Sequence, residues 1–324
     1  MIDAKSIIDL MLAHVQEKEV QIEMYFIKKT NSRMPEKKNR VFSVSIAGDV
    51  RMKFAKTIVS QLNTIKIQDL KFKDFFASDL MPEHEHIAVI ESLLLIPTFR
   101  YIEMQMEQHT NLNQIKTFEG GSIEGLHSYA IEFKSVNNKV IYFRKYTKGS
   151  VISSKNTLFS FNDGIFNRVY GDVCKFDDFI DCIYYKLDNI HEIMYILSRN
   201  DFESIFALLD LYIIESKKVF EKLTSFKNFE IQKDLRDQIL DKPAFLKRIA
   251  HLSLQGVFDK IDINRISKIK EMVPSLKFEV KNNKIVISDK DCFKDFLDVC
   301  EKNILKDLVD DQEFFRTRNK EPLK

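Results

Sequence analysis

Two runs of alternating apolar and polar residues between Ser128 and Tyr146 constrain the fold of this chain more than any other stretch. Alternation with a period of two places successive side chains on opposite faces of a β-strand. The dipeptide Asn137–Asn138 lies between the two runs, and asparagine tolerates the positive φ angles of a type I′ turn. The pattern therefore predicts a β-hairpin with a two-residue turn.

A second pair of strand-like runs follows this hairpin. Phe179–Tyr185 and Glu192–Leu197 are rich in apolar and aromatic side chains and flank Asp188–Asn189. A helical pattern begins at Ser198, directly after the second run, and continues through Phe206. We therefore expect an antiparallel β-meander whose last strand leads straight into a long helix.

The N-terminal region mixes helix and strand patterns. Helical spacing of apolar residues marks three segments, at 4–15, 49–62 and 97–109. Alternation marks two strands, at 20–27 and 41–47. The Gly-rich break at Phe118–Gly121 ends this region. We expect an α+β fold in three parts: a mixed N-terminal region at 1–118, the central meander at 119–215, and a helical C-terminal domain at 216–324.

The C-terminal part combines helices with one basic hairpin. Helical patterns cover four segments, at 201–229, 244–257, 262–273 and 292–309. Leu276–Ile287 predicts two strands joined by Asn282–Asn283. Two short helices followed by a hairpin have the order of a winged helix, in which the helix at 262–273 would enter the major groove of DNA. A small α+β domain with solvated lysines is the alternative.

In the winged-helix interpretation, basic and amide side chains of the helix and the hairpin would contact DNA. The helix would contribute Arg265, Lys268 and Lys270. The hairpin would contact phosphates through Lys277, Lys281, Asn282, Asn283 and Lys284.

The overall charge excludes one class of protein. With 50 basic and 48 acidic residues, the net charge is +2, so the chain is not a uniformly basic nucleic-acid binder, although a local basic face is compatible with it. The four cysteines, which form no C-x-x-C motif, predict reduced, buried thiols in a cytoplasmic protein. The start of the sequence has no secretory leader pattern, and its apolar runs are far shorter than the ~18 residues of a membrane span.

One segment has no acidic residue. From Phe133 to Asn162 the charged side chains are all basic: Lys134, Lys139, Arg144, Lys145, Lys148 and Lys155. With aromatic residues between them, they could contact phosphates along a sheet edge. Alternatively, the lysines discourage pairing between exposed strand edges.

Other patterns indicate chemistry less specifically. Glu132 and Lys134 have the E-x-K spacing of Mg²⁺-dependent, restriction-endonuclease-like nucleases, although no upstream aspartate is clearly placed to complete such a site. Gly48–Asp49 lies between a strand and a helix without a Gly-rich phosphate-binding motif. His84 and His86 would need a third metal ligand from elsewhere in the chain. We therefore expect no catalytic residue, metal site or cofactor.

Three stretches resemble a known family. Lys139–Lys148, Phe179–Tyr184 and Met194–Phe206 are similar to the core of the KwaB family, and the resemblance extends over about 126–308. KwaB proteins are the cytosolic half of the bacterial Kiwa anti-phage system. The resemblance implies a homodimer that binds DNA, docks on a membrane-embedded KwaA-type partner, and hinders replication and transcription of phage DNA.

The resemblance supplies no motif of DNA-contacting residues, so the expected site rests on charge and topology. The candidate DNA-binding residues are Arg144, Lys145, Lys148, Lys155, Arg265, Lys268, Lys277, Lys281 and Lys284. Two other functions remain open: a metal-dependent nuclease that uses Glu132 and Lys134, and an assembly protein that oligomerises through the helix after Asp201.

Overall fold

The computed structural model describes residues 4–32, 34, 38–46, 48–67, 71–76, 86–91, 93–112, 125–146, 159–162, 165–168, 179–188, 191–301, 304–306, 314–316 and 321–323. The chain divides into two compact units. Unit 1 comprises Met1–Phe72 and Glu85–Phe206, and unit 2 comprises Lys73–His84 and Ala207–Lys324.

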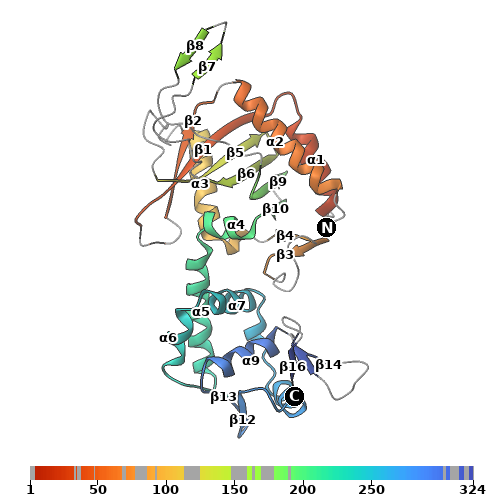
Figure 1. Cartoon of the computed structure of the whole chain (residues 1–324), viewed down its shortest axis with the longest axis vertical. Helices are drawn as coiled ribbons and strands as arrows, with labels where there is room; N and C mark the ends of the chain where they lie inside the picture. Colours follow the sequence, from red (N-terminus) through yellow and green to blue (C-terminus); the bar gives the residue numbers. More distant parts are fainter. Residues whose placement is uncertain are drawn as a thin grey trace. The chain divides into compact units, whose positions relative to one another are not determined.

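Unit 1 is organised around a large sheet with the strand order β2-β1-β5-β6-β9-β10-β4-β3 (Figure 1). Its strands are β1 (Gln21–Lys29), β2 (Asn39–Val44), β3 (Lys71–Asp74), β4 (His86–Ile90), β5 (Leu126–Lys134), β6 (Lys139–Lys145), β9 (Cys182–Leu187) and β10 (His191–Ile196). From β2 to β4, neighbouring strands pair antiparallel. Between β6 and β9 in the chain, β7 (Phe159–Asn162) and β8 (Ile165–Arg168) form a separate two-stranded sheet.

The predicted α+β fold and its meander are confirmed. The strands β5, β6, β9 and β10 follow one another in both sequence and sheet order, and α4 (Arg199–Ile205) begins directly after β10. The long helix predicted from Asp201 is interrupted, because Ala207 adopts a left-handed conformation with φ 52° before α5 (Leu208–Ser225) begins.

The two Asn-Asn dipeptides form different turns. Lys134 pairs with Lys139, and the Ser135 N–H donates to the Asn138 carbonyl at 2.9 Å, so Val136 and Asn137 occupy the centre of the first turn. Neither residue has a positive φ, so the predicted type I′ turn at Asn137–Asn138 is wrong. Asn282 and Asn283 have φ angles of 50° and 60°, as a type I′ turn requires.

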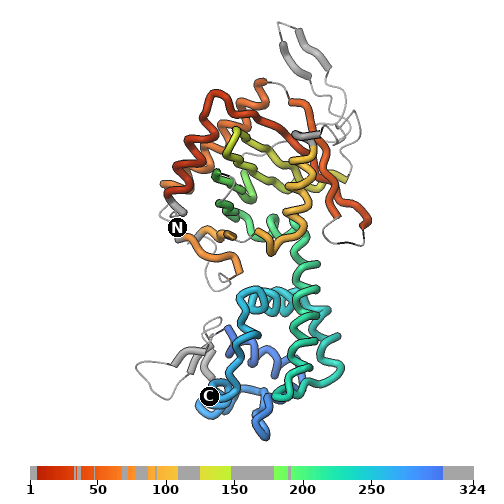
Figure 2. Tube along the Cα trace, turned by 180° about the vertical axis from the view of Figure 1, so that it is seen from behind, coloured from red at the N-terminus to blue at the C-terminus, as the bar shows by residue number. Residues whose placement is uncertain are grey.

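Helices cover both faces of the large sheet. On one face, α1 (Ala4–Val15) and α2 (Gly48–Ile67) lie side by side and bury Met11, Ile58 and Leu62 against strand residues such as Ile131 and Tyr142 (Figures 1 and 2). On the other face, Phe99 of α3 (Pro97–Leu112) packs against Phe143, Tyr184 and Phe206. Successive strand residues point to opposite faces of the sheet. Because helices cover both faces, the side chains on both faces are buried. A short 3-10 helix, η2 (Leu93–Leu95), precedes α3.

Unit 2 has a helical core and a small sheet of order β11-β13-β12. Its further elements are β11 (Phe229–Ile231), α6 (Leu235–Leu240), α7 (Pro243–Leu254), η3 (Val257–Asp259), α8 (Ile263–Met272), β12 (Glu279–Lys281), β13 (Lys284–Ile287) and α9 (Lys290–Cys300). The strands β14 (Ile304–Lys306), β15 (Phe314–Arg316) and β16 (Glu321–Leu323) form another sheet. Phe278, Ile285, Phe293 and Phe296 are fully buried in the core.

The hairpin predicted at Leu276–Ile287 is present as β12 and β13, and β11 adds a strand parallel to β13. The helix predicted through residue 309 ends earlier, at Cys300, and β14 follows it. The boundary predicted at 118/119 lies inside unit 1, because β1 pairs with β5 across it. The boundary predicted at 215/216 lies within α5, and the C-terminal segment of unit 2 begins at Ala207.

Candidate nucleic-acid interface

The helix α8 presents two cations to solvent. The Asp262 carboxylate caps the helix by accepting the N–H groups of Asn264 at 3.0 Å and Arg265 at 3.3 Å. Ile266 is buried against the core of unit 2, so Arg265 and Lys268 lie on the exposed side of the helix. Within the described residues neither of these side chains forms an ion pair, which leaves both charges available to an anionic partner.

Lys270, the third basic residue predicted to contact DNA from this helix, has a structural role. Its ammonium group donates to the carbonyl oxygens of Pro274 at 2.7 Å and Leu276 at 2.5 Å. These contacts satisfy carbonyl groups just beyond the C-terminal end of α8. Lys270 is therefore occupied with the backbone that connects α8 to the hairpin.

The hairpin contains paired and unpaired lysines. Lys277 forms an ion pair with Asp291 at 2.6 Å, and Lys281 forms one with Glu279 on the same strand. Their hydrogen bonds to these carboxylates raise the pKa values of both lysines. Lys284 is exposed and has no such partner among the described residues. Exposed ion pairs contribute little to stability, so Lys277 and Lys281 can exchange their carboxylates for phosphates.

The two elements adjoin, because α8 contacts β12 within unit 2. Arg265, Lys268 and Lys284, which we call the α8–hairpin cations, are accompanied by the exposed amides of Asn282 and Asn283 at the turn. The positive φ angles of Asn282 and Asn283 form a tight two-residue turn at the tip of the hairpin. The arrangement provides unpaired cations and amide donors of the kind that contact phosphate oxygens.

The cations predicted from the central meander have a different environment. The Arg144 guanidinium forms an ion pair with Asp181, which is fully buried, and Arg144 itself is 16% exposed. The Lys145 N–H donates to the Asp181 carboxylate at 2.6 Å, and the Lys145 ammonium lies 3.2 Å from Asp201. Burial raises the pKa of Asp181, and the Lys145 N–H and Arg144 oppose this effect. These contacts join β6 to the start of β9 and to α4, so Arg144 has a structural role. Lys148 and Lys155 lie outside the described residues.

The two residues of the E-x-K pair differ in exposure, because Glu132 is buried and Lys134 is partly exposed. Glu132 is 1% exposed, and its carboxyl accepts a hydrogen bond from the Tyr25 hydroxyl at 3.2 Å. Burial raises the pKa of Glu132, although Lys139 and Lys134 oppose this effect. In the part of the chain that the structure describes, no three histidine, cysteine, aspartate or glutamate side chains gather as a metal site. The geometry gives Glu132 a buried, hydrogen-bonded environment instead of the open face on which a nuclease would bind its substrate.

A charge network next to this pair was missed by sequence reasoning. Glu103 of α3 accepts from the Lys139 ammonium at 2.8 Å, from Arg100 at 2.6 Å and from the Tyr184 hydroxyl at 2.9 Å. Lys139 also contacts Glu107 at 3.0 Å. Burial opposes ionisation of Glu103, but Lys139 and Arg100 hold its pKa below the usual range. The network joins α3 to the sheet, and the only signal for it in the sequence is a glutamate at a helix position between apolar residues.

Among the described helices, none is both long and apolar enough to cross a membrane. A comparison with protein families finds a match to the family described as Kiwa protein KwaB-like, over residues 123–309. This match covers more than half of the chain.

The chain belongs to the KwaB-like family. The KwaB-like region begins just before β5 and extends beyond α9, so it includes the meander, α4 and the α8–hairpin cations. Membership makes the chain a component of Kiwa defence and confirms the predicted family. No curated protein and no solved structure matches the chain.

Proposed function

We propose that this KwaB-like chain binds DNA within a Kiwa anti-phage complex, and that it does so through α8 and the β12–β13 hairpin. Phage DNA held in this way would be hindered in replication and transcription. The observation that carries the proposal is that Arg265, Lys268 and Lys284 are exposed and lack ion-pair partners among the described residues.

Contacts of this kind predict binding with little sequence preference. Side chains on α8 reach either base edges or phosphates, whereas Lys284 and the turn amides suit the phosphate backbone. Lys277 and Lys281 would join the interface by releasing Asp291 and Glu279. Arg144 is not part of the proposed interface, because its guanidinium forms an ion pair with the buried Asp181.

The proposal includes two protein partners. Membership of the KwaB-like family supports a homodimer and a membrane-embedded partner of the KwaA type. A dimer would present two copies of the α8–hairpin cations to one duplex, which strengthens binding by raising the effective concentration of the second site.

A salt titration tests the proposal. Fluorescence anisotropy with the full-length protein and a labelled duplex should show tight binding at low salt that weakens steeply as salt rises, because each neutralised phosphate releases condensed counterion. Two duplexes of unrelated sequence should give similar slopes. An absence of binding at low salt would refute the DNA-binding proposal.

A further inference from the structure

The strands β1 and β2 extend as a basic hairpin beyond the end of their neighbour β5 in unit 1 (Figure 1). β5 pairs with β1 only as far as Lys28, whereas β1 and β2 remain paired one residue further. The Thr30 N–H donates to the Lys38 carbonyl at 2.6 Å, which continues the pairing past both strands. Residues 28–40 include six basic residues and one acidic residue. They precede residues 123–309, so the family match does not cover this hairpin.

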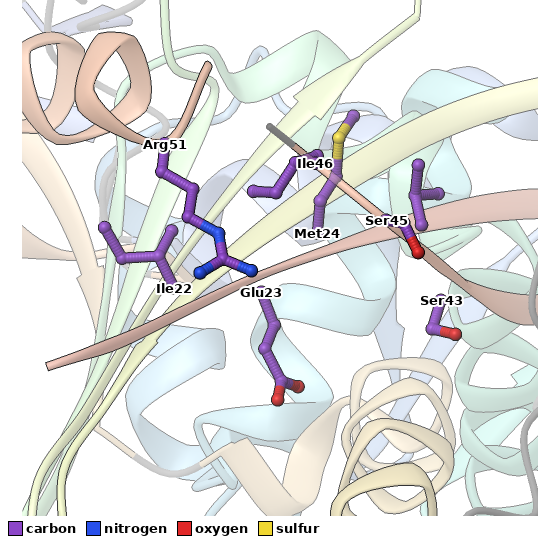
Figure 3. Close-up of a pocket in the computed structure, with 8 residues that line it drawn as sticks. Ile22, Glu23, Met24, Ser43, Ser45, Ile46 and Arg51 are labelled. Atoms are coloured by element: carbon purple, nitrogen blue, oxygen red, sulfur yellow. The ribbon is translucent and has the colours of Figure 1, made fainter. Parts of the chain in front are cut away.

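Charge is unevenly distributed along the β1–β2 pair. The only acidic residue of the two strands is Glu23, near the start of β1 and far from the basic end. A groove of about 270 Å³ lies at that end of the pair, and its lining includes Glu23 and Arg51 (Figure 3). The Glu23 side chain points away from Arg51, and its carboxylate accepts a hydrogen bond from the Tyr25 hydroxyl. Neither strand therefore places a carboxylate beside the cations of the hairpin.

Two of these cations lie directly opposite each other. Lys28 and Arg40 are cross-strand partners, so their side chains share one face of the two-stranded ribbon. Like charges in such positions destabilise a sheet, whereas an anionic partner bound between them would stabilise it. Arg40 is exposed, and its guanidinium carbon lies 5.4 Å from the centre of the Phe42 ring on the same face. This contact orients the guanidinium and leaves its charge in place.

Lys29 lies on the opposite face of the ribbon, because successive side chains of a strand alternate. It is exposed, and it is close enough to His127 of β5 to act on the charge of that side chain. Burial lowers the pKa of His127, and the positive charges of Lys29 and Lys145 lower it further. The hydrogen bond between His127 and the Ser204 carbonyl, at 3.0 Å, opposes this effect. The hairpin thus presents cations on both of its faces.

We propose that the β1–β2 hairpin is a second DNA-binding element, which enters a groove of the duplex as a two-stranded ribbon. Lys28 and Arg40 face one phosphate strand of the groove, and Lys29 faces the other; we call these three the β1–β2 cations. The inference rests on the proposed DNA binding and places a further contact in unit 1. The major groove is about 12 Å wide and admits a two-stranded ribbon.

The distribution of charge over two faces favours a duplex over a membrane surface. Two phosphate strands border each groove of DNA, so a ribbon between them has an anionic partner on both sides. A flat layer of anionic lipid headgroups would meet the cations of one face and leave those of the other in water. The arrangement of the β1–β2 cations therefore matches the groove.

Substitution of the β1–β2 cations in the full-length protein tests the inference. In Lys28→Gln/Lys29→Gln/Arg40→Gln, fluorescence anisotropy should show weaker binding to a labelled duplex. The slope of log affinity against log salt should be shallower by up to about 3, because each lost phosphate contact removes about 1.

The matched control is Lys18→Gln/Lys53→Gln/Lys56→Gln. It removes three exposed cations from other parts of unit 1 and should keep the original affinity and slope. Thermal unfolding of each variant checks that it folds.

Variants of one face test the two-sided contact. Lys28→Gln/Arg40→Gln removes the cations of one face, and Lys29→Gln removes the cation of the other. Each variant should weaken duplex binding, with slopes shallower by up to about 2 and about 1, respectively. Lys29 is exposed, so Lys29→Gln is expected to fold normally even where the double substitution perturbs the sheet.

Each result decides the inference. Weaker binding and shallower slopes in both one-face variants, with the control unchanged, support it. Unchanged affinity and slope in the triple β1–β2 variant overturn it, as does a loss from one face alone. Binding to phosphatidylglycerol vesicles that depends on the β1–β2 cations, while duplex binding does not, also overturns it.

Failure of this inference is distinguishable from failure of the proposed function. If only the loss of the α8–hairpin cations weakens duplex binding, this inference fails and the proposed function stands. If only the loss of the β1–β2 cations weakens it, this inference stands and the proposed interface at α8 fails. An absence of duplex binding by the unsubstituted protein at low salt overturns both.

Discussion

At the scale of single residues, the stability of unit 2 depends on a buried cluster of charged side chains formed by Arg248, Asp298 and Glu301. The Arg248 guanidinium is 8% exposed and donates to Glu301 at 2.8 and 2.7 Å and to Asp298 at 2.7 Å. Removing one member of a buried cluster leaves uncompensated charges. We therefore expect Arg248→Met to lower the free energy of unfolding by about 3–5 kcal/mol in urea denaturation.

The matched control is Arg236→Met. Arg236 is 43% exposed and lies 3.9 Å from Glu221, so solvent screens the pair and its loss should change the free energy of unfolding by less than about 1 kcal/mol. Equal effects of the two substitutions would show that the buried cluster does not join α7 to α9 as described.

Glu132 predicts a dependence of stability on pH. Burial raises its pKa in the folded state above the value near 4.5 of the unfolded chain. As pH rises from the unfolded-state pKa toward the folded-state pKa, the unfolded chain ionises first, and the folded state loses stability relative to it. Glu132→Gln removes this loss and keeps an acceptor for Tyr25.

The stability of Glu132→Gln relative to the unsubstituted protein should therefore increase as pH rises above the unfolded-state pKa of Glu132, near 4.5, toward its raised folded-state pKa. Urea denaturation at several pH values measures this difference. A stability difference that stays constant across the range would mean that Glu132 ionises in the folded protein as readily as in the unfolded chain.

Residue roles were the least predictable feature of the sequence. Lys139, Arg144 and Lys145 lie in a segment without acidic residues, which made phosphate contact a reasonable interpretation. Their carboxylate partners come from distant positions: Glu103, Glu107, Asp181 and Asp201. Charge along a sequence reports neighbours in the chain, whereas the folded sheet decides which acid each cation meets. Among the residues that the structure describes, Arg265, Lys268 and Lys284 have no ion-pair partner, and nothing in the sequence around them distinguished them from the other basic residues.

At the scale of elements, the two Asn-Asn turns provide an internal comparison. Asn283 adopts φ 60°, a conformation that glycine reaches without steric cost, whereas Asn138 has no positive φ. We expect Asn283→Gly to be neutral or slightly stabilising. Asn138→Gly should lower the free energy of unfolding by about 0.5–1 kcal/mol, because glycine adds unfolded-state entropy and gains nothing in return.

Urea denaturation of the two glycine variants measures the difference. If glycine has the same effect at both positions, the two turns do not differ in the way that their φ angles indicate.

The existence of elements followed from periodicity, but their ends and turns did not. The strands of the meander and the helices α1, α2, α3, α7 and α8 were all expected from apolar spacing. The turn at Val136–Asn137 is set by the pairing of β5 with β1 and β6, which fixes its register one residue away from the asparagine pair. The break at Ala207 lies inside a continuous helical pattern of apolar residues, so the spacing gave no sign of the left-handed conformation that separates α4 from α5.

At the scale of the whole chain, long-range pairing decides the organisation. β1 pairs with β5 although more than a hundred residues separate Glu23 from Glu132, and this pairing places the N-terminal region and the meander in one sheet. Composition gave no sign of it, since the Gly-rich break at Phe118–Gly121 lies between strands of the same sheet. The helix α8 and the β12–β13 hairpin could be predicted because they are adjacent in the sequence. They are also the elements that we propose to bind DNA.

The proposed homodimer predicts a mass. Light scattering of the purified full-length protein should give twice the mass of the chain, and the added DNA should bind the dimer without dissociating it. A monomer at all concentrations would remove the dimer from the proposal while leaving the DNA contacts of a single chain to be tested separately.

The salt dependence of DNA binding by a triple variant tests the central claim most directly. In Arg265→Ala/Lys268→Ala/Lys284→Ala, anisotropy titrations should show weaker binding to every duplex. The slope of log affinity against log salt should be shallower by up to about 3, because each lost phosphate contact removes about 1. The control Lys18→Ala/Lys53→Ala/Lys56→Ala removes three exposed cations from unit 1 and should keep the original slope. A triple α8–hairpin variant that binds DNA with unchanged affinity and slope would contradict the account.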